Sequence, residues 1–432
     1  MKRISQEISD FPFQEKFKVN KNDFTRRRKQ SFLFTIIFIS NFIRKSLSLE
    51  IENFVSYLQT QCGLSNAVSF TKSAFVQCRK KINPEVFKHL STLVVEEFYS
   101  DNEASVKLWN GFRVLAVDGS ILTLPRTQEL KDIYGETKSQ NTDGVIQARV
   151  SVLYDVLNNI VLDGIISTLS VGERHLAKQH LAIVREKDLI IYDRGYPSFD
   201  LIYKHTKENV DYLIRVRTDF SNLTKTFAAS GKTSQTVDIS PGQRKSHSIK
   251  PYNKEATIKV RLIRIKLASG QIEILMTSLL DSKKYRQKIF KELYFKRWGV
   301  ETYYDELKNK LKVEHFSGYS HQTVLQDFYA ALFISNIQTI IVNDLEDEIK
   351  QVSQNRQYEY KVNNNMSYGL LKDKIISLLF SNPNIEEVDK ELKALLMKNL
   401  IPIRPNRTNI RSKDKYKRRK KPKVVKNQKD TI

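Results

Sequence analysis

The sequence is poor in cysteine and glycine. Its 432 residues include two cysteines, Cys62 and Cys78, and 14 glycines. Two cysteines cannot cross-link a fold of this size or form a four-cysteine zinc site, so we expect a reduced, intracellular protein. Neither a GxxxxGK(S/T) nor a GxGxxG pattern occurs, which argues against a glycine-rich, phosphate-binding nucleotide loop.

Long hydrophobic runs are also missing. The most apolar early stretch, residues 31–43, is shorter than the roughly 20 residues that a membrane span needs and is interrupted by Thr35, Ser40 and Asn41. We therefore expect a buried helix here, with no membrane span and no export signal.

Acidic residues are too few to balance the basic ones, because 72 Lys and Arg face 48 Asp and Glu for a net charge of +24. This excess favours a polyanionic partner, nucleic acid before a membrane. Residues 403–432 carry 13 basic residues against Asp414 and Asp430. Such a run cannot bury enough apolar surface to fold, so we expect a disordered tail. It is either a solvated tail or an arm that neutralises phosphates, and the basic remainder of the chain favours the arm.

Hydrophobic periodicity divides the chain into six parts. Residues 1–105 are mostly helical in pattern, and within them residues 69–82 resemble a short helix with an exposed basic end. That helix either reads DNA or is an ordinary surface helix. The remaining parts are an α/β region (106–209), a β-rich region (210–283), a region of two long helices (284–345), a helical C-terminal region (346–402) and the basic tail (403–432).

Two aspartates follow two short apolar runs. The pattern predicts two buried strands, residues 114–117 and 188–192, which end at Asp118 and Asp193. It also predicts a hairpin formed by residues 145–154 and 160–167. Ends of parallel strands share one edge of a sheet, where two carboxylates repel each other unless a cation neutralises them. Oxygen ligands without Cys or His favour Mg²⁺ or Mn²⁺. The alternative is that both aspartates simply form turns.

A long helix expected over residues 281–311 strengthens the case for a site. At roughly 100° per residue, one narrow stripe contains Tyr294, Arg297, Glu301 and Lys308. An apolar face beside the stripe contains Leu293, Val300, Tyr304, Leu307 and Leu311. The opposite, solvent-facing side contains Glu292, Lys296, Tyr303 and Lys310. The helix can therefore pack on a sheet while holding Glu301 at the edge of the packed face.

Two neighbours on this helix leave alternatives open. Asp305 lies close to the stripe and is the rival third carboxylate, although Glu301 is preferred. Trp298 also lies near the stripe, where it either stacks on an unpaired base or packs in the core. Of these two roles for Trp298, packing is favoured.

The spacing Y-x2-R-x3-E-x6-K, from Tyr294 to Lys308, resembles the signature of the insertion-sequence-four family of bacterial DDE transposases. The sequence around each of the three acidic residues also resembles that family. The three segments are LAVDGSILTLP, IIYDRGYPSFDLI and LYFKRWGVETYYDELKNKLKVEHFSG. The order of the acidic residues and the gap of 108 positions between Asp193 and Glu301 also match. The resemblance covers about residues 65–345.

The resemblance implies an α/β protein with a ribonuclease-H-like catalytic core in two parts, 106–209 and 284–345. A β-rich insertion, a helical N-terminal DNA-binding domain and a basic C-terminal tail complete it. It also implies that Asp118, Asp193 and Glu301 are catalytic and bind two Mg²⁺ or Mn²⁺ ions. The residues that would contact DNA are Tyr294, Arg297, Lys308 and, more weakly, Arg194.

By the same resemblance, the enzyme would cleave double-stranded DNA at terminal inverted repeats and join the 3′ ends to target DNA. It would act as a homodimer in the bacterial cytoplasm, at the nucleoid and away from membranes. Two alternatives stay open: a metal-dependent nuclease on the same core, and an inactive DNA-binding regulator derived from a transposase.

Deleting residues 412–432 should weaken binding to all DNA sequences alike, because the tail would contact phosphates and not bases. The dependence of log affinity on log salt should flatten by about 0.9 for each lost contact. Fluorescence anisotropy with duplex DNA over a salt series measures both effects. An unchanged slope would identify the tail as solvated and uninvolved.

Overall fold

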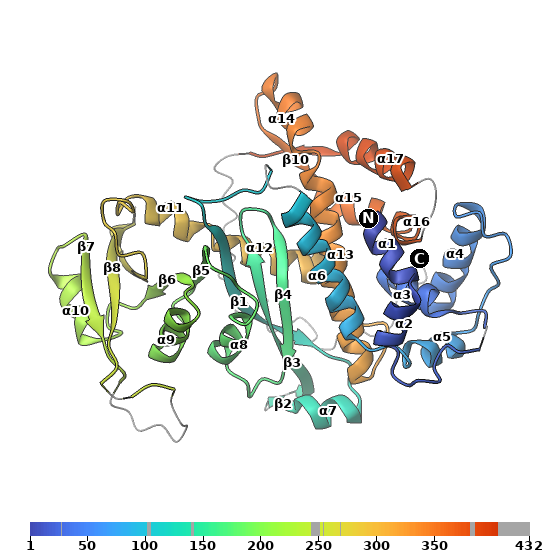
Figure 1. Cartoon of the computed structure of the whole chain (residues 1–432), viewed down its shortest axis with the longest axis horizontal. Coiled ribbons are helices and arrows are strands. Elements are labelled where there is room, and N and C mark those ends of the chain that lie inside the picture. The colour runs from blue at the N-terminus through green and yellow to red at the C-terminus, as the bar shows by residue number, and fades with distance from the viewer. Residues whose placement is uncertain are drawn as a thin grey trace. The chain divides into compact units, whose positions relative to one another are not determined.

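The structure is a computed structural model that describes residues 1–26, 28–101, 105–139, 142–242, 251–253, 255–267, 269–380 and 385–404. The basic tail expected over 403–432 lies outside the described residues from 405 onward. The chain divides into two compact units (Figure 1). The sheet unit comprises Ala104–Ile121 and Arg149–Tyr304, and the helical unit comprises Met1–Glu103, Leu122–Ala148 and Asp305–Ile432.

The sheet unit is built on a mixed sheet with the strand order β3-β1-β5-β6-β9-β8-β7, and β4 pairs with β3. The strands are β1 (Arg113–Thr123), β3 (Thr142–Asp155), β4 (Ile160–Ser167), β5 (Asp188–Tyr192), β6 (Asp211–Val216), β7 (Ser234–Ile239), β8 (Ile258–Lys266) and β9 (Ile272–Thr277). The pairs β1–β5 and β5–β6 are parallel, whereas β6–β9, β8–β9, β7–β8 and β3–β4 are antiparallel.

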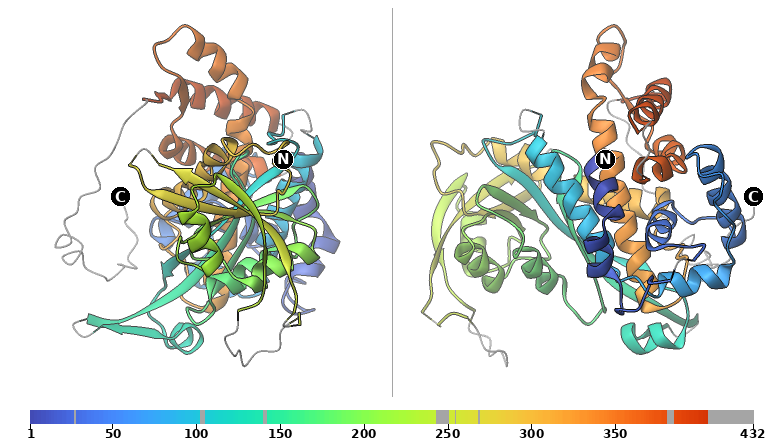
Figure 2. Two further views of the ribbon diagram at one scale, coloured as in Figure 1. Left: turned by 90° about the vertical axis from the view of Figure 1, so that its left-hand side faces the viewer. Right: turned by 45° about the vertical axis from the view of Figure 1, so that its right-hand side comes forward.

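Helices cover both faces of this sheet, which explains the continuous apolar runs of its central strands. One face packs with α8 (Glu173–His180), α9 (Phe199–Lys207) and α10 (Asn222–Ala229). The other face packs with α11 (Ile289–Phe295). Figure 1 shows α8 and α9 in front of the strands, and Figure 2 shows the twist of the sheet. The expected hairpin is confirmed as β3 and β4.

The first strand is longer than expected. The prediction that it stops at Asp118 is wrong, because β1 continues to Thr123. Its residues are fully buried up to Val117 and half-buried from Asp118 to Ser120. The polar Asp-Gly pair therefore marks where the strand leaves the core, and the strand continues beyond it.

The single long helix expected over residues 281–311 is also wrong. The chain forms α11, a turn at Lys296 and Arg297, α12 (Trp298–Asp305) and a π-helical turn, η1 (Glu306–Lys310). Around the break, backbone N–H groups bond three residues back, as from Arg297 to Tyr294 and from Val300 to Arg297. This tighter winding shifts the helical phase, so side chains beyond Arg297 depart from a regular 100° progression.

The helical unit is assembled from distant parts of the sequence. Its helices are α1 (Lys2–Ser9), α2 (Phe11–Phe17), α3 (Phe32–Ser40), α4 (Leu47–Thr60), α5 (Lys72–Arg79), α6 (Glu85–Asp101), α7 (Gln128–Tyr134), η1, α13 (His321–Asn343), α14 (Glu346–Gln354), α15 (Asn364–Leu371), α16 (Lys374–Leu379) and α17 (Ile385–Lys398). Short strands are β2 (Glu136–Ser139), paired with β3, and the pair β10 (Tyr360–Val362) and β11 (Leu400–Pro402).

The core of this unit is α13, which lies alongside α6 in both views (Figures 1 and 2). Among the described helices, α13 alone is long and apolar enough to cross a membrane, with 78% of its apolar window buried inside the protein. A core helix passes the same test, so this is weak evidence for a membrane span. A Ser320 cap fixes the start of α13, because the Ser320 side chain accepts from the N–H of Thr323.

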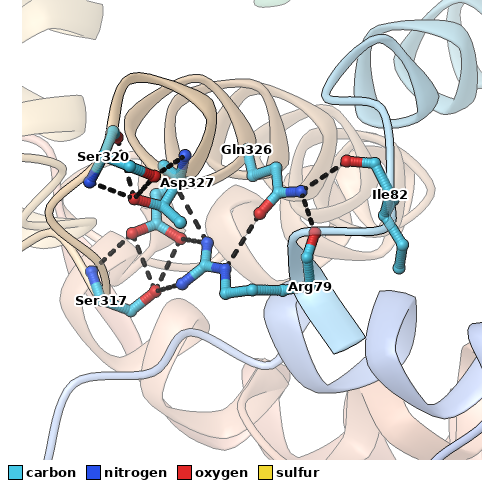
Figure 3. Close-up of polar contacts among 7 residues, drawn as sticks. Arg79, Ile82, Ser317, Ser320, Gln326 and Asp327 are labelled. Carbon is cyan, nitrogen blue, oxygen red and sulfur yellow. Dashed lines mark hydrogen bonds and ion pairs between the residues drawn. The ribbon is translucent and has the colours of Figure 1, made fainter. Parts of the chain in front are cut away.

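A buried arginine fastens α5 to the start of α13 (Figure 3). The side chain of Arg79 is 1% exposed and donates to Asp327 at 2.9 Å, to Gln326 at 2.9 Å and to Ser317 at 2.7 Å. The expectation of an exposed basic end on residues 69–82 is therefore wrong for Arg79, although Lys80 is exposed. A buried charge requires such a set of partners, so this contact fixes the position of α5.

Replacing Asp327 by Asn should lower the free energy of unfolding by about 3–5 kcal/mol, because it leaves the buried Arg79 charge without its counter-ion. Urea denaturation followed by circular dichroism measures the change. Asp344→Asn is the matched control, since Asp344 pairs with Lys393 on the surface. It should cost less than about 1 kcal/mol. Equal losses in the two variants would contradict the structural role of the buried pair.

Candidate active site

The two strand aspartates lie in register. The parallel ladder of β1 and β5 runs from Arg113 opposite Asp188 to Ala116 opposite Ile191. At its first step, Arg113 makes two 2.7 Å hydrogen bonds to the buried Asp188 carboxylate, which fixes the alignment of the strands. Asp118 and Asp193 each follow the last paired residue by two positions. They therefore lie beyond the same end of the β1–β5 ladder, although β1 itself continues to Thr123.

The Asp118 carboxylate lies in an unusual electrostatic environment. Burial raises its pKa to about 6, opposed by a hydrogen bond from the N–H of Gly119 and by the charge of Arg297. The negative charges of Glu301 and Asp193 raise the pKa further. Both acidic residues therefore act on Asp118 through their negative charge.

An arginine lies between two of these carboxylates. The guanidinium of Arg297 contacts Glu301 through Nη2 and lies 3.6 Å from Asp118 through Nη1. The side chain is 7% exposed, and its Nε has no hydrogen-bond partner among the described residues. Burial opposes the charge, but the Glu301 hydrogen bond and the nearby carboxylates raise the pKa of Arg297. Arg297 is thus the protein's own cation for this pair.

A second arginine, which the sequence reasoning missed, neutralises Asp193. Arg215, on β6, lies 3.4 Å from Asp193 and 2.7 Å from Glu273 on β9. The Tyr294 ring links the two arginines, since the guanidinium carbons of Arg215 and Arg297 each lie 6.0 Å from its centroid. The Tyr294 hydroxyl is buried without a hydrogen-bond partner among the described residues, and burial raises its pKa to about 12. The feature that could have identified Arg215 is its position near the end of β6, a strand parallel to β5.

Despite the break in the helix, part of the predicted stripe of side chains lies together. Tyr294, Arg297 and Glu301 do come together, although they belong to α11, a turn and α12. Lys308 lies in η1 and Asp305 ends α12, and both belong to the helical unit, so their proximity to the carboxylates stays a prediction. Burial lowers the pKa of Lys308.

Other residues near the site differ from expectation. Tyr303, expected to face solvent, is 4% exposed and stacks on Tyr154 with ring centroids 4.9 Å apart. Trp298, expected to pack in the core, is 43% exposed. Packing against Tyr154 accounts for the burial of Tyr303. Arg194 is exposed and borders a cavity of about 570 Å³ that Arg215 and Glu273 also line.

The three carboxylates are suitable ligands for a divalent metal ion, but in this structure the guanidinium of Arg297 lies against two of them. Within the described residues, no three His, Cys, Asp or Glu side chains are gathered closely enough to hold a metal ion. Three carboxylates that repel one another nevertheless form a hard, oxygen-only donor set of the kind Mg²⁺ and Mn²⁺ prefer. For an ion to reach both Asp118 and Glu301, the guanidinium of Arg297 must move away.

A buried Ser-His-Asp arrangement elsewhere in the sheet unit is not a second active site. His180 bonds Ser151 at 2.9 Å and Asp163 at 2.8 Å. Ser151 and His180 are 0% exposed, so no substrate can reach the hydroxyl. These contacts satisfy the hydrogen-bonding groups of a core histidine.

Comparisons with known proteins point in one direction. A family model described as Transposase DDE domain matches residues 109–337. Transposase InsG for insertion sequence element IS4, from Escherichia coli K12, is 20% identical over 343 residues, 78% of this chain and 74% of that protein. Putative transposase InsZ from the same organism is 29% identical over 98 residues, 22% of this chain and 32% of that protein.

Among solved structures, the cryo-EM structure of the piggyBac transposase synaptic complex with hairpin DNA covers 95% of this chain and 86% of its own. It is 11% identical with a TM-score of 0.42, a similarity too low to support an argument about this fold.

The family model spans more than half of the chain and includes Asp118, Asp193 and Glu301. The family resemblance noted in the motifs is thereby confirmed. The chain belongs to the bacterial DDE transposases of the insertion-sequence-four type, a family that catalyses metal-dependent cleavage and strand transfer of DNA.

Proposed function

We propose that this transposase cleaves double-stranded DNA at the terminal inverted repeats of an insertion sequence and joins the 3′ ends to target DNA, with Asp118, Asp193 and Glu301 as its catalytic carboxylates. The observation that carries this assignment is geometric: Arg297 contacts Glu301 and lies 3.6 Å from Asp118, and Asp118 and Asp193 follow the same parallel pair of strands. Like charges gathered at the edge of a sheet favour cation binding there.

The three carboxylates would hold two Mg²⁺ or Mn²⁺ ions. Bound ions would activate water or a 3′-hydroxyl and stabilise the leaving oxygen. Phosphoryl transfer then needs little from the protein beyond positioning and neutralisation of charge. The backbone N–H of Gly119 orients the Asp118 carboxylate at 2.9 Å, and the Tyr304 hydroxyl donates to the Asp118 carbonyl at 2.8 Å. Both contacts limit the freedom of Asp118.

Arg297 would have two alternative partners. Without metal and DNA it neutralises Asp118 and Glu301. With metal bound, its forked guanidinium would be released to contact a DNA phosphate in the manner arginine favours. Tyr294 would guide this movement, since its ring lies against the guanidinium. Lys308 and Arg194 are the further candidates for phosphate contacts.

The arrangement of the strands supports a ribonuclease-H-like core. Its central strands β1, β5 and β6 are parallel, and the antiparallel β3–β4 hairpin adjoins β1. Strands β7 to β9 also lie in sequence between Asp193 and Glu301, so the insertion predicted over 210–283 would begin only after β6, which pairs with β5. We further propose that residues 1–105 bind DNA, that the enzyme acts as a homodimer on DNA, and that it works in the cytoplasm at the nucleoid.

Glu301→Gln should abolish strand cleavage by several orders of magnitude, because it removes a carboxylate that holds the metal while keeping the side-chain shape. Binding to transposon ends should persist or tighten. Asp305→Asn is the matched control and should stay within a few-fold of the unmodified protein. Gel assays with end-containing duplexes measure nicking and binding. A cleaving Glu301→Gln variant with an inactive Asp305→Asn variant would assign the third carboxylate to Asp305.

The same assay distinguishes a transposase of this mechanism from a plain nuclease. Cleavage with Mg²⁺ or Mn²⁺ should stop in EDTA, and products joined to target DNA should appear beside the cleaved ends. Full cleavage in EDTA would contradict the metal assignment. Cleavage without joined products would favour the nuclease alternative.

Arg297→Gln should strengthen the binding of Mn²⁺ in the absence of DNA while weakening cleavage. The substitution removes the competing cation, so we expect about tenfold tighter binding, equivalent to roughly 1.4 kcal/mol. Electron paramagnetic resonance of free Mn²⁺ measures the change. Arg217→Gln, which removes an exposed pair with Asp219, is the control and should change nothing. Weaker Mn²⁺ binding in Arg297→Gln would show that Arg297 does not compete with the metal.

A further inference from the structure

The helical unit contains a basic cavity that the active site does not use. It has a volume of about 310 Å³ and lies between the segment linking α2 to α3 and the end of α5. Its lining includes Phe24, Arg26, Arg28, Gln30, Cys78 and Lys81. The volume falls at the lower end of the roughly 300–1,000 Å³ typical of small-molecule sites.

The wall formed by the end of α5 is held rigidly. The amide of Gln326 donates to the carbonyls of Arg79 and Ile82 at 2.9 and 2.8 Å (Figure 3). The amide of Gln322 donates to the carbonyls of Lys80 and Ile82. On the other side, the N–H of Val19 donates to the Lys81 carbonyl at 2.9 Å. The turn that presents Cys78 and Lys81 to the cavity is therefore fixed before any ligand binds.

The cavity is electropositive. Arg26 and Arg28 are exposed and form no ion pair within the described residues, and Lys81 lies 3.8 Å from Asp23. Burial raises the pKa of the Cys78 thiol, and the charges of Lys81 and Arg28 lower it, so both cations lie near the sulfur. Two unpaired guanidinium groups at the mouth favour an anionic ligand such as a phosphate.

Gln30 indicates what else the ligand carries. Its side chain is 3% exposed and lines the cavity, yet neither its amide oxygen nor its amide nitrogen has a hydrogen-bond partner among the described residues. A buried amide left unpaired is costly, and such groups in folded proteins are normally satisfied. A phosphate can only accept, so it would satisfy the nitrogen alone. A ligand with an adjacent donor and acceptor would satisfy both atoms.

We propose that this cavity binds one unpaired nucleotide of a DNA strand, with its phosphate at Arg26 and Arg28 and its base edge on the amide of Gln30. Adenine is the base that fits, because glutamine pairs in a bidentate manner with adenine N6 and N7. The Phe24 ring supplies an apolar wall of the kind on which bases stack. The cavity volume of about 310 Å³ is enough for a single nucleotide.

A nucleotide within a DNA strand is favoured over a free nucleotide. Arg26 and Arg28 are exposed, so a strand can run past them, and the net charge of +24 attracts a polyanion. This inference rests on the proposed action of the enzyme on DNA. It adds a strand-binding site within the helical unit.

The test measures binding of fluorescent single-stranded dA15 and dT15 to the full chain. The unmodified protein should prefer dA15, and Gln30→Leu should lower the affinity for dA15 by about 5- to 150-fold while leaving dT15 within about twofold. Arg26→Gln with Arg28→Gln should weaken both strands and flatten the log-log salt slope by about 1.4. Lys21→Gln with Lys72→Gln, two exposed lysines outside the cavity, is the matched control and should leave the preference intact.

Cys78 reports occupancy of the cavity independently of affinity. In a Cys62→Ser background Cys78 is the remaining thiol. Bound dA15 should slow its alkylation by a small uncharged reagent at least several-fold, and dT15 should slow it less. This readout stays informative if Gln30→Leu folds poorly, because it leaves the cavity residues unchanged.

Three results would overturn the proposal: no preference for dA15 in the unmodified protein, an unchanged preference in a folded Gln30→Leu variant, or an unprotected Cys78. If millimolar dAMP protects Cys78 fully from alkylation and dA15 does not protect it, the ligand of the cavity is a free nucleotide and not a nucleotide within a DNA strand. If Glu301→Gln abolishes cleavage as expected but the dA15 and Cys78 tests fail, the proposal for the cavity is overturned and the proposed function is not. Failure of the unmodified protein to bind any DNA would overturn the proposed function as well.

Discussion

Repulsion between carboxylates at one edge of the sheet is the constraint on which the site depends. The parallel register of β1 and β5 leaves Asp118 and Asp193 side by side, and Glu301 joins them from α12. Charges this close require a positive partner. Arg297 and Arg215 fill that role in the free protein, and the aromatic ring of Tyr294 lies between them. The enzyme thus has an internally neutralised site before any ion or substrate arrives.

The sheet positions the two aspartates, and the break in the helix positions Arg297. The strands fix the two aspartates through the Arg113–Asp188 pair, which lies at the opposite end of the ladder from the site. The break at Arg297 frees that residue from a regular helical position. A rigid pair of aspartates therefore faces an arginine whose backbone belongs to a turn, and the arginine is the part most able to change partners.

The sequence singled out the three carboxylates because each has a strong local signal, and their catalytic role stays a prediction. Asp118 and Asp193 follow apolar runs, and Glu301 lies within a spaced motif with Tyr294 and Arg297. The errors arose where three-dimensional contacts override local pattern. Tyr303 is buried against Tyr154 of another element, and Arg79 is buried by partners some 240 residues away. No periodicity in the sequence encodes such contacts, and Arg215 likewise becomes significant only when β6 is placed beside β5.

The helical unit also constrains the order in which the protein can be made. The buried charge of Arg79 emerges from the ribosome 248 residues before Asp327, and α6 emerges long before α13. During synthesis the N-terminal helices must therefore wait with apolar surfaces uncovered while the whole sheet unit is translated. Contacts of such high sequence separation slow folding and expose the chain to aggregation, so chaperone supply is expected to limit how much active enzyme a cell accumulates.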